Sequence, residues 1–172
     1  VTIVGNGQDI HGAGFVGTTA TGMHCIFTDC VNNANIDLNI NNGDYLRDEK
    51  GKILYDAGTT TITYLKPRAG GIAGICNDGE FTNCVNNGYL SISGGLVGRG
   101  ALKKGSNALT FVRCVNNGEV IADDVCVNDD KDGLQKSGTY AGGISGYLGC
   151  SGNVGVYTAL GCVNNAKIVA PY

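Results

Sequence analysis

The chain has 172 residues, a formal net charge of −3 and 29 glycines beside only two prolines. This length is enough for one domain with a buried core, and the glycines indicate tight corners rather than a disordered Pro-Gly tract. No basic cluster stands out, which argues against a nucleic-acid partner. No apolar run approaches the roughly 18 residues of a membrane-spanning helix, so no membrane span is expected.

Residues 1–17 are expected to form the first strands, with Ile3, Ile10 and Phe15 in the core. The chain lacks an initiator Met, so we expect it to be part of a longer precursor or assembly. His11 and His24 have no partner at a metal-binding spacing, and each is expected to face solvent or to be bonded locally.

An eight-residue stretch centred on Cys-Val-Asn-Asn then recurs four times. Its copies occupy residues 27–34, 81–88, 111–118 and 159–166. Apolar and polar residues alternate on both sides of the Asn-Asn pair in the same register each time, which indicates strands that flank a corner. Asn and Gly tolerate the left-handed backbone conformation, so the Asn-Asn-Gly segment is expected to supply that corner.

A second recurrent element, Gly-x-x-Gly, precedes each of these stretches and begins at Gly14, Gly71, Gly95 and Gly143. The shortest unit has 24 residues, 10 from Gly74 to Cys84 and 14 from Cys84 to Gly98. A unit of this length with short strands is typical of one rung of a parallel β-helix.

The sequence therefore predicts an all-β fold, a right-handed parallel β-helix (β-solenoid) of about four to five rungs. Residues 1–172 are expected to form a single domain with two insertions, at about 39–69 and 123–141. The alternative is a meander of antiparallel hairpins, because Asn-Gly is also a strong hairpin signal. That alternative does not explain why the same residue types return in one register.

Stacked rungs about 4.8 Å apart would place equivalent residues above one another as ladders. The ladder residues are Phe27, Phe81 and Phe111; Cys30, Cys84, Cys114 and Cys162; and Asn32, Asn86, Asn116 and Asn164. Asparagine side chains can hydrogen-bond along such a stack, which satisfies polar groups at a buried corner.

Residues 70–74 and 79–88, Gly-Gly-Ile-Ala-Gly and Gly-Glu-Phe-Thr-Asn-Cys-Val-Asn-Asn-Gly, resemble the GLUG-motif repeats of large secreted and cell-surface proteins. The resemblance covers the four units from about Gly12 to the C-terminus but not the insertions. It implies an extracellular or cell-surface location and a repeat-built stalk, as in adhesins and surface proteases. It also implies a scaffold rather than an active site, so no enzymatic activity is expected.

The other four of the eight cysteines do not share a register with the ladder. Cys126 and Cys150 are expected to tie down the second insertion, and Cys25 and Cys76 to tie neighbouring rungs. Stacked Cα atoms also fall within the disulfide window, so a Cys84–Cys114 bridge is sterically allowed. Disulfides would fit an extracellular setting.

The second insertion is acidic, and residues 128–133 match the front half of a calcium-binding loop. Asn128, Asp130 and Asp132 are the candidate calcium ligands, and calcium is the one cofactor that the sequence suggests. The full EF-hand pattern needs Glu where Thr139 stands, which rejects an EF-hand. A helix-free calcium loop and a solvated acidic turn both remain open.

The sequence supports two candidate functions. The first is an extracellular structural or adhesive β-solenoid module, a stalk or filament subunit of a cell-surface structure. Its partners would be copies of itself stacked end to end or neighbouring repeats of a longer chain, with cell-surface glycans or host proteins as further partners. The alternative is a carbohydrate-binding or carbohydrate-active β-helix, similar to polysaccharide lyases or hydrolases. Its sugars would stack on outward tyrosines such as Tyr89 and Tyr147, but the acidic residues crowd one loop rather than lining a groove.

Overall fold

The described part of the chain is entirely β-structure. The computed structural model describes residues 11–20, 22–38, 68–91, 93–102, 108–122, 140–150 and 155–170. These ranges contain strands and no helix, and every strand pair in them is parallel. The antiparallel-hairpin alternative is therefore wrong, and the arrangement is compatible with a β-solenoid.

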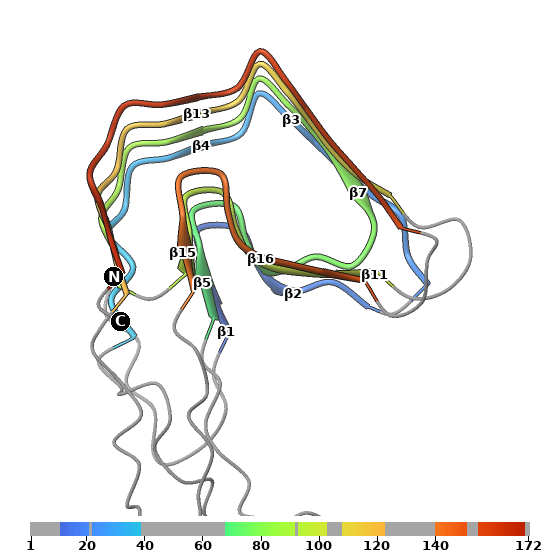
Figure 1. Ribbon diagram of the computed structural model, residues 1–172, viewed down its shortest axis with the longest axis horizontal. Coiled ribbons are helices and arrows are strands. Elements are labelled where there is room, and N and C mark those ends of the chain that lie inside the picture. The colour runs from blue at the N-terminus through green and yellow to red at the C-terminus, as the bar shows by residue number, and fades with distance from the viewer. Residues whose placement is uncertain are drawn as a thin grey trace, which may run out of the picture.

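The described chain passes through the same sheets in the same order four times. We call these passes coil 1 (residues 11–38), coil 2 (68–91), coil 3 (93–122) and coil 4 (140–170). Figure 1 looks down the stack, so the coils overlap in outline. Coil 1 and coil 4 form the two ends of the described stack, because their strands are the outermost members of the four-stranded sheets.

Each sheet collects one strand from each coil that contributes to it. The first sheet contains β1 (His11–Ala13), β5 (Arg68–Gly70), β10 (Ser93–Gly94) and β15 (Ala141–Gly142). The second contains β2 (Val16–Thr18), β6 (Ala73–Ile75), β11 (Val97–Leu102) and β16 (Ser145–Cys150). The third contains β3 (Cys25–Thr28), β7 (Gly79–Thr82), β12 (Ala108–Val112) and β17 (Val156–Leu160).

The two remaining sheets follow the Cys-Val-Asn-Asn motif. The fourth contains β4 (Val31–Asn32), β8 (Val85–Asn86), β13 (Val115–Asn116) and β18 (Val163–Asn164). The fifth contains β9 (Leu90–Ser91), β14 (Val120–Ile121) and β19 (Ile168–Val169), and coil 1 joins it through a bridge from Ile36 to Leu90. Arg68, Ala69 and Ala141 thus belong to strands, although the sequence assigned them to the insertions. Of the remaining residues of both insertions, only Tyr140 lies within the described ranges.

The sharp corner of each coil lies before the cysteine, not at Asn-Asn-Gly. Asp29, Asn83 and Arg113 have φ values of 54°, 53° and 50°, and Gly161 has 61°. The left-handed conformation predicted for the Asn-Asn-Gly segment is therefore wrong. Asp and Asn enter this region more readily than other side chains, whereas Arg113 does so at a cost of about 1 kcal/mol. In Figure 1 this corner is the apex between β3 and β4.

The first Gly of each Gly-x-x-Gly turn packs against an asparagine of the ladder. A Cβ added at Gly71 would lie 2.5 Å from Asn86 Cγ, and one added at Gly95 would lie 2.5 Å from Asn116 Cγ. Only glycine leaves room for this approach. Figure 1 shows the turn between β15 and β16 reaching inward toward β13. This contact pinches the cross-section of every coil.

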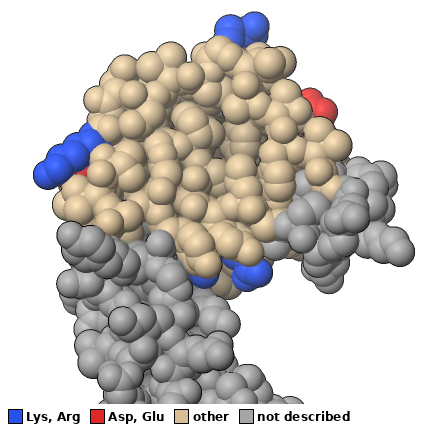
Figure 2. Space-filling view, in the orientation of Figure 1, with Lys and Arg blue, Asp and Glu red and all other residues tan. Residues whose placement is uncertain are grey.

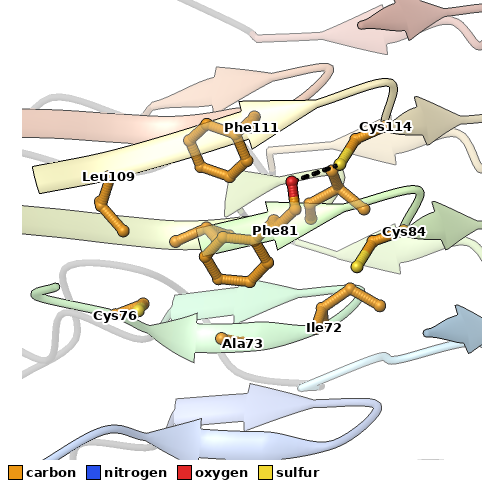
Figure 3. Packing of buried hydrophobic residues seen from close by; sticks show 10 residues of the cluster. Ile72, Ala73, Cys76, Phe81, Cys84, Leu109, Phe111 and Cys114 are labelled. Carbon is orange, nitrogen blue, oxygen red and sulfur yellow. Dashed lines mark hydrogen bonds between the residues drawn. The ribbon is translucent and has the colours of Figure 1, made fainter. Parts of the chain in front are cut away.

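The pinch divides the core into two lobes. The major lobe contains Ile72, Ala73, Cys76, Phe81, Cys84, Leu96, Val97, Leu109, Phe111 and Cys114. The minor lobe contains Ile36, Leu38, Ala69, Leu90 and Val120. In the major lobe the ring of Phe81 stacks between Phe27 and Phe111, with centroid distances of 4.7 and 5.0 Å. Figure 3 shows Phe111 above Phe81, with the cysteines beside them.

Core positions lose their cover at the ends of the stack. Phe15, predicted to be in the core, is 52% exposed, so that prediction is wrong. Its equivalents Ile72 and Leu96 are fully buried because described coils lie on both sides of them. Ile3 and Ile10 lie outside the described residues.

We expect Asn86→Ala to lower the free energy of unfolding by about 3 kcal/mol, because it leaves several buried polar partners unpaired. Asn86 is fully buried and bonds to Asn32, Gly88 and Asn116. Urea denaturation measures the loss. The matched control is Asn87→Ala in the exposed neighbour, which should cost less than about 1 kcal/mol. Equal losses for the two variants would contradict a structural role for the buried amide.

Candidate functional site at the ends of the stack

A ladder of asparagine amides, the inner ladder, runs through all four coils and is buried in coils 1 to 3. Asn32 Nδ2 donates to Asn86 Oδ1 at 2.7 Å, Asn86 Nδ2 to Asn116 Oδ1 at 2.8 Å, and Asn116 Nδ2 to Asn164 Oδ1 at 2.7 Å. Every bond of this ladder thus points from coil 1 toward coil 4. Each Nδ2 also donates to the backbone carbonyl two residues on, as Asn86 does to Gly88 at 2.9 Å.

A second ladder, the outer ladder, uses the next residue of each motif and runs in the opposite direction. Asn87 Nδ2 donates to Asn33 Oδ1, Asn117 Nδ2 to Asn87 Oδ1, and Asn165 Nδ2 to Asn117 Oδ1, each at 2.8 Å. These bonds point from coil 4 toward coil 1. The stack therefore carries two rows of asparagine amides that point in opposite directions, both on the side formed by the fourth sheet.

The phenylalanine ladder stops before coil 4 and leaves a pocket there. Ala159 pairs with Phe111 and occupies the phenylalanine position. A pocket of about 300 Å³ opens at this place. Its lining is almost entirely apolar and comprises Phe111, Ile144, Ser145, Leu148, Tyr157, Thr158 and Ala159. The pocket exists because the side chain that would stack on Phe111 is missing.

Apolar side chains are exposed in both terminal coils of the stack. In coil 1 they are Phe15, Met23, Ile26 and Val31, and in coil 4 they are Leu148, Val156, Leu160 and Val163. Figure 2 shows one end face, where the charged side chains of the described residues lie at the rim. An apolar surface on a strand edge is prone to further pairing.

The charges of the two ends differ in sign. In its described residues coil 1 carries two carboxylates, Asp29 and Asp37, and no Lys or Arg. Among the residues described in coil 4, Lys167 is the single charged side chain, and its Nζ lies 3.8 Å from Glu119 Oε1 of coil 3.

Every cysteine whose side chain the structure describes is a free thiol, in contrast to the disulfides that the sequence predicted. Cys25, Cys76, Cys84 and Cys114 carry no disulfide, so the Cys25–Cys76 and Cys84–Cys114 pairings are wrong. Cys114 Sγ donates instead to Phe81 O at 3.3 Å (Figure 3). Burial raises the pKa of Cys76 to about 11, which keeps that thiol protonated at neutral pH. The Cys126–Cys150 pairing involves side chains outside the described ones.

His24 is bonded locally, as expected for a lone histidine. Its Nδ1 lies 2.9 Å from Asp78 Oδ1, and its Nε2 lies 3.5 Å from Glu80 Oε1. The hydrogen bond to Asp78, with the charges of both carboxylates, raises the pKa of His24 above its ordinary 6.5. His11 Nδ1 likewise lies 2.9 Å from Thr18 Oγ1.

A small aromatic cluster lies on the outer surface. The rings of Tyr140 and Tyr147 are 4.7 Å apart with a tilt of 59°, and Arg99 Cζ stands 5.7 Å from the Tyr147 ring centroid. Aromatic faces beside a guanidinium are the kind of surface on which sugar rings stack.

The candidate calcium ligands Asn128, Asp130 and Asp132 lie outside the described residues. Within the described ranges, no group of three or more His, Cys, Asp and Glu side chains could hold a metal ion. In the same ranges, no helix has the length and apolar character needed to cross a membrane.

Comparison with protein-family models, with curated proteins and with solved structures found no match for this chain.

Sequence reasoning brought the ladder residues together but missed the pocket and the opposed directions of the two asparagine rows. The pocket had a readable signal, because Ala159 stands where the other three motifs have Phe. The direction of each asparagine row had no such signal in the sequence, because it depends on the orientation of the side-chain amides.

We expect protonation of His24 to stabilise the fold, because its pKa is higher when folded than when unfolded. This contribution is fully present below about pH 6.5 and is lost as the pH rises through the raised pKa. The stability advantage of the wild type over His24→Gln should therefore shrink between about pH 6 and pH 8. Denaturation at several pH values measures it.

An NMR titration of the His24 ring provides the control. Asp78→Asn should lower the midpoint toward the ordinary value, since it removes the principal hydrogen-bond acceptor. A wild-type midpoint at or below 6.5 would contradict the ion pair.

Proposed function

We propose that this chain is an extracellular structural module, a β-solenoid that serves as a stalk or filament subunit of a cell-surface structure. The observation that carries the proposal is the pair of stack ends. Both expose apolar side chains and strand edges that, among the described residues, no further coil covers. Such edges pair readily with further strands.

The proposal also includes the handedness of the β-helix, the number of its rungs and its resemblance to GLUG-motif repeats. We infer a right-handed β-helix of four to five rungs, because about 98% of crossovers between parallel strands of one sheet are right-handed. The resemblance to GLUG-motif repeats supports a scaffold rather than an enzyme. Partners would be copies of the chain or neighbouring repeats, together with cell-surface glycans or host proteins.

Negative-stain imaging of the purified chain over a range of concentrations tests this function. We expect rods that lengthen with concentration, because stacked ends bury the exposed apolar surface and pair the strand edges. Particles that keep the length of one chain at every concentration would contradict a self-assembling subunit. Parallel samples with calcium and with chelator test the candidate calcium loop.

A carbohydrate-binding module is the second candidate, and the cluster of Tyr140, Tyr147 and Arg99 favours it. If sugars stack there, Tyr147→Ala should weaken binding to a polysaccharide ligand about fivefold, since aromatic contacts of this kind contribute about 1 kcal/mol. Tyr89→Ala, at an outer position outside this cluster, is the matched control. Calorimetry against neutral and acidic polysaccharides measures both, and equal affinities would reject the cluster as the binding site.

A further inference from the structure

We propose that coil 4 of one copy receives coil 1 of a second copy, head to tail, so that both asparagine ladders continue across the junction. This inference rests on the proposed function and deepens it, because it fixes the polarity and the contact residues of the assembly. Four independent features of the two ends support it.

The inner ladder ends in a donor on one side and an acceptor on the other. At the coil 4 end, Asn164 Nδ2 donates to Ala166 O, and its second N–H has no acceptor among the described residues. At the coil 1 end, Asn32 Oδ1 accepts only from Ala34 N among the described residues, whereas Asn86 Oδ1 accepts two bonds. Coil 1 of a second copy would therefore place an open acceptor over an open donor.

The outer ladder gives the same result with the roles exchanged. Asn165 Oδ1 at the coil 4 end has no donor within the described residues, and Asn33 Nδ2 at the coil 1 end has no acceptor there. A head-to-tail junction pairs these two groups as well. A head-to-head junction would set donor against donor in one row and acceptor against acceptor in the other, which leaves all four groups unpaired.

The backbone hydrogen bonds of the fourth sheet would also continue across the junction. Val85 N donates to Cys30 O at 2.8 Å, and Val163 N donates to Cys114 O at 2.9 Å, so this N–H always points toward coil 1. At the junction, the equivalent N–H of Val31 in the second copy would meet Cys162 O. The strands would remain parallel, as they are throughout the described stack.

The pocket in coil 4 matches aromatic side chains of coil 1. Phe27 has the same register position as Ala159, and Phe15 has that of Ile144, which lines the pocket. A second copy would thus bring Phe27 and the exposed Phe15 over the opening. Asp37 of coil 1, which lies two residues after the register position of Lys167, would also approach that lysine and add an attraction between opposite charges.

Two variants of the full chain, each blocked at one end, test the polarity. Phe15→Asp places a carboxylate on the coil 1 face, and Ala159→Asp places one in the coil 4 pocket. Both positions are exposed in the single chain, so the fold should tolerate them; circular dichroism checks this. Each charge would be buried unpaired at a junction and should weaken association about 100-fold or more.

Sedimentation velocity gives the readout. We expect each variant alone to be monomeric where the wild type assembles, and an equimolar mixture to form one-to-one dimers through its single intact junction. Ala159→Phe is the matched control and should assemble, because an added ring would continue the phenylalanine ladder. Val31→Pro, which removes the N–H at the edge strand, is a second coil 1 variant and should behave as Phe15→Asp does.

The outcomes separate this inference from the proposed function. If the wild type forms rods but either blocked variant still dimerises alone, the head-to-tail junction is wrong and the filament function stands. If the mixture stays monomeric although the wild type assembles, the junction is likewise wrong. If the wild type remains monomeric, both the junction and the self-assembling function are overturned.

Discussion

In coils 1 to 3, each asparagine of the inner ladder donates one N–H to the backbone carbonyl two residues on and the other to the asparagine of the next coil. A buried amide has two donors and two acceptor sites, and Asn86 and Asn116 lie without exposure inside the protein. Leaving any of these groups unpaired would cost about 1 to 3 kcal/mol. The coils must therefore keep one register and one spacing, since a shift along the chain would break every rung of the ladder.

The same row of amides shapes the cross-section of the coil. The Gly-x-x-Gly turn presses against it, and the two sides of that contact become the major and minor lobes of the core. The motif Cys-Val-Asn-Asn and the motif Gly-x-x-Gly, far apart in sequence within each coil, are thus two halves of one contact. A side chain in place of Gly71 would displace Asn86 from its ladder, so the glycine and the asparagine require each other.

The repeat in the sequence was enough to predict parallel stacking, because four motifs in one register leave few other ways to bury the same positions. Phe81, Cys84 and Asn86 could be assigned to the interior from period-two alternation. The left-handed corner at Arg113 could not be predicted, because arginine has no preference for this conformation and the tertiary fold imposes it. Phe15 had a core pattern, but burial depends on a covering coil, which no local pattern reveals. The free thiols at Cys84 and Cys114 could not be predicted either. The spacing of the coils allows a disulfide, but Cys114 Sγ donates a hydrogen bond to a backbone carbonyl instead.

An asparagine amide is a dipole as well as a hydrogen-bonding group, and the two ladders orient these dipoles in opposite senses along the stack. Aligned peptide dipoles in a helix add up to a charge at each end. Here each added coil contributes one amide in each sense, so the axial contributions of the two rows cancel however many coils are stacked. A rod built in this way has a defined direction in its hydrogen bonds, yet its ladders build up no growing electrostatic potential at its tips.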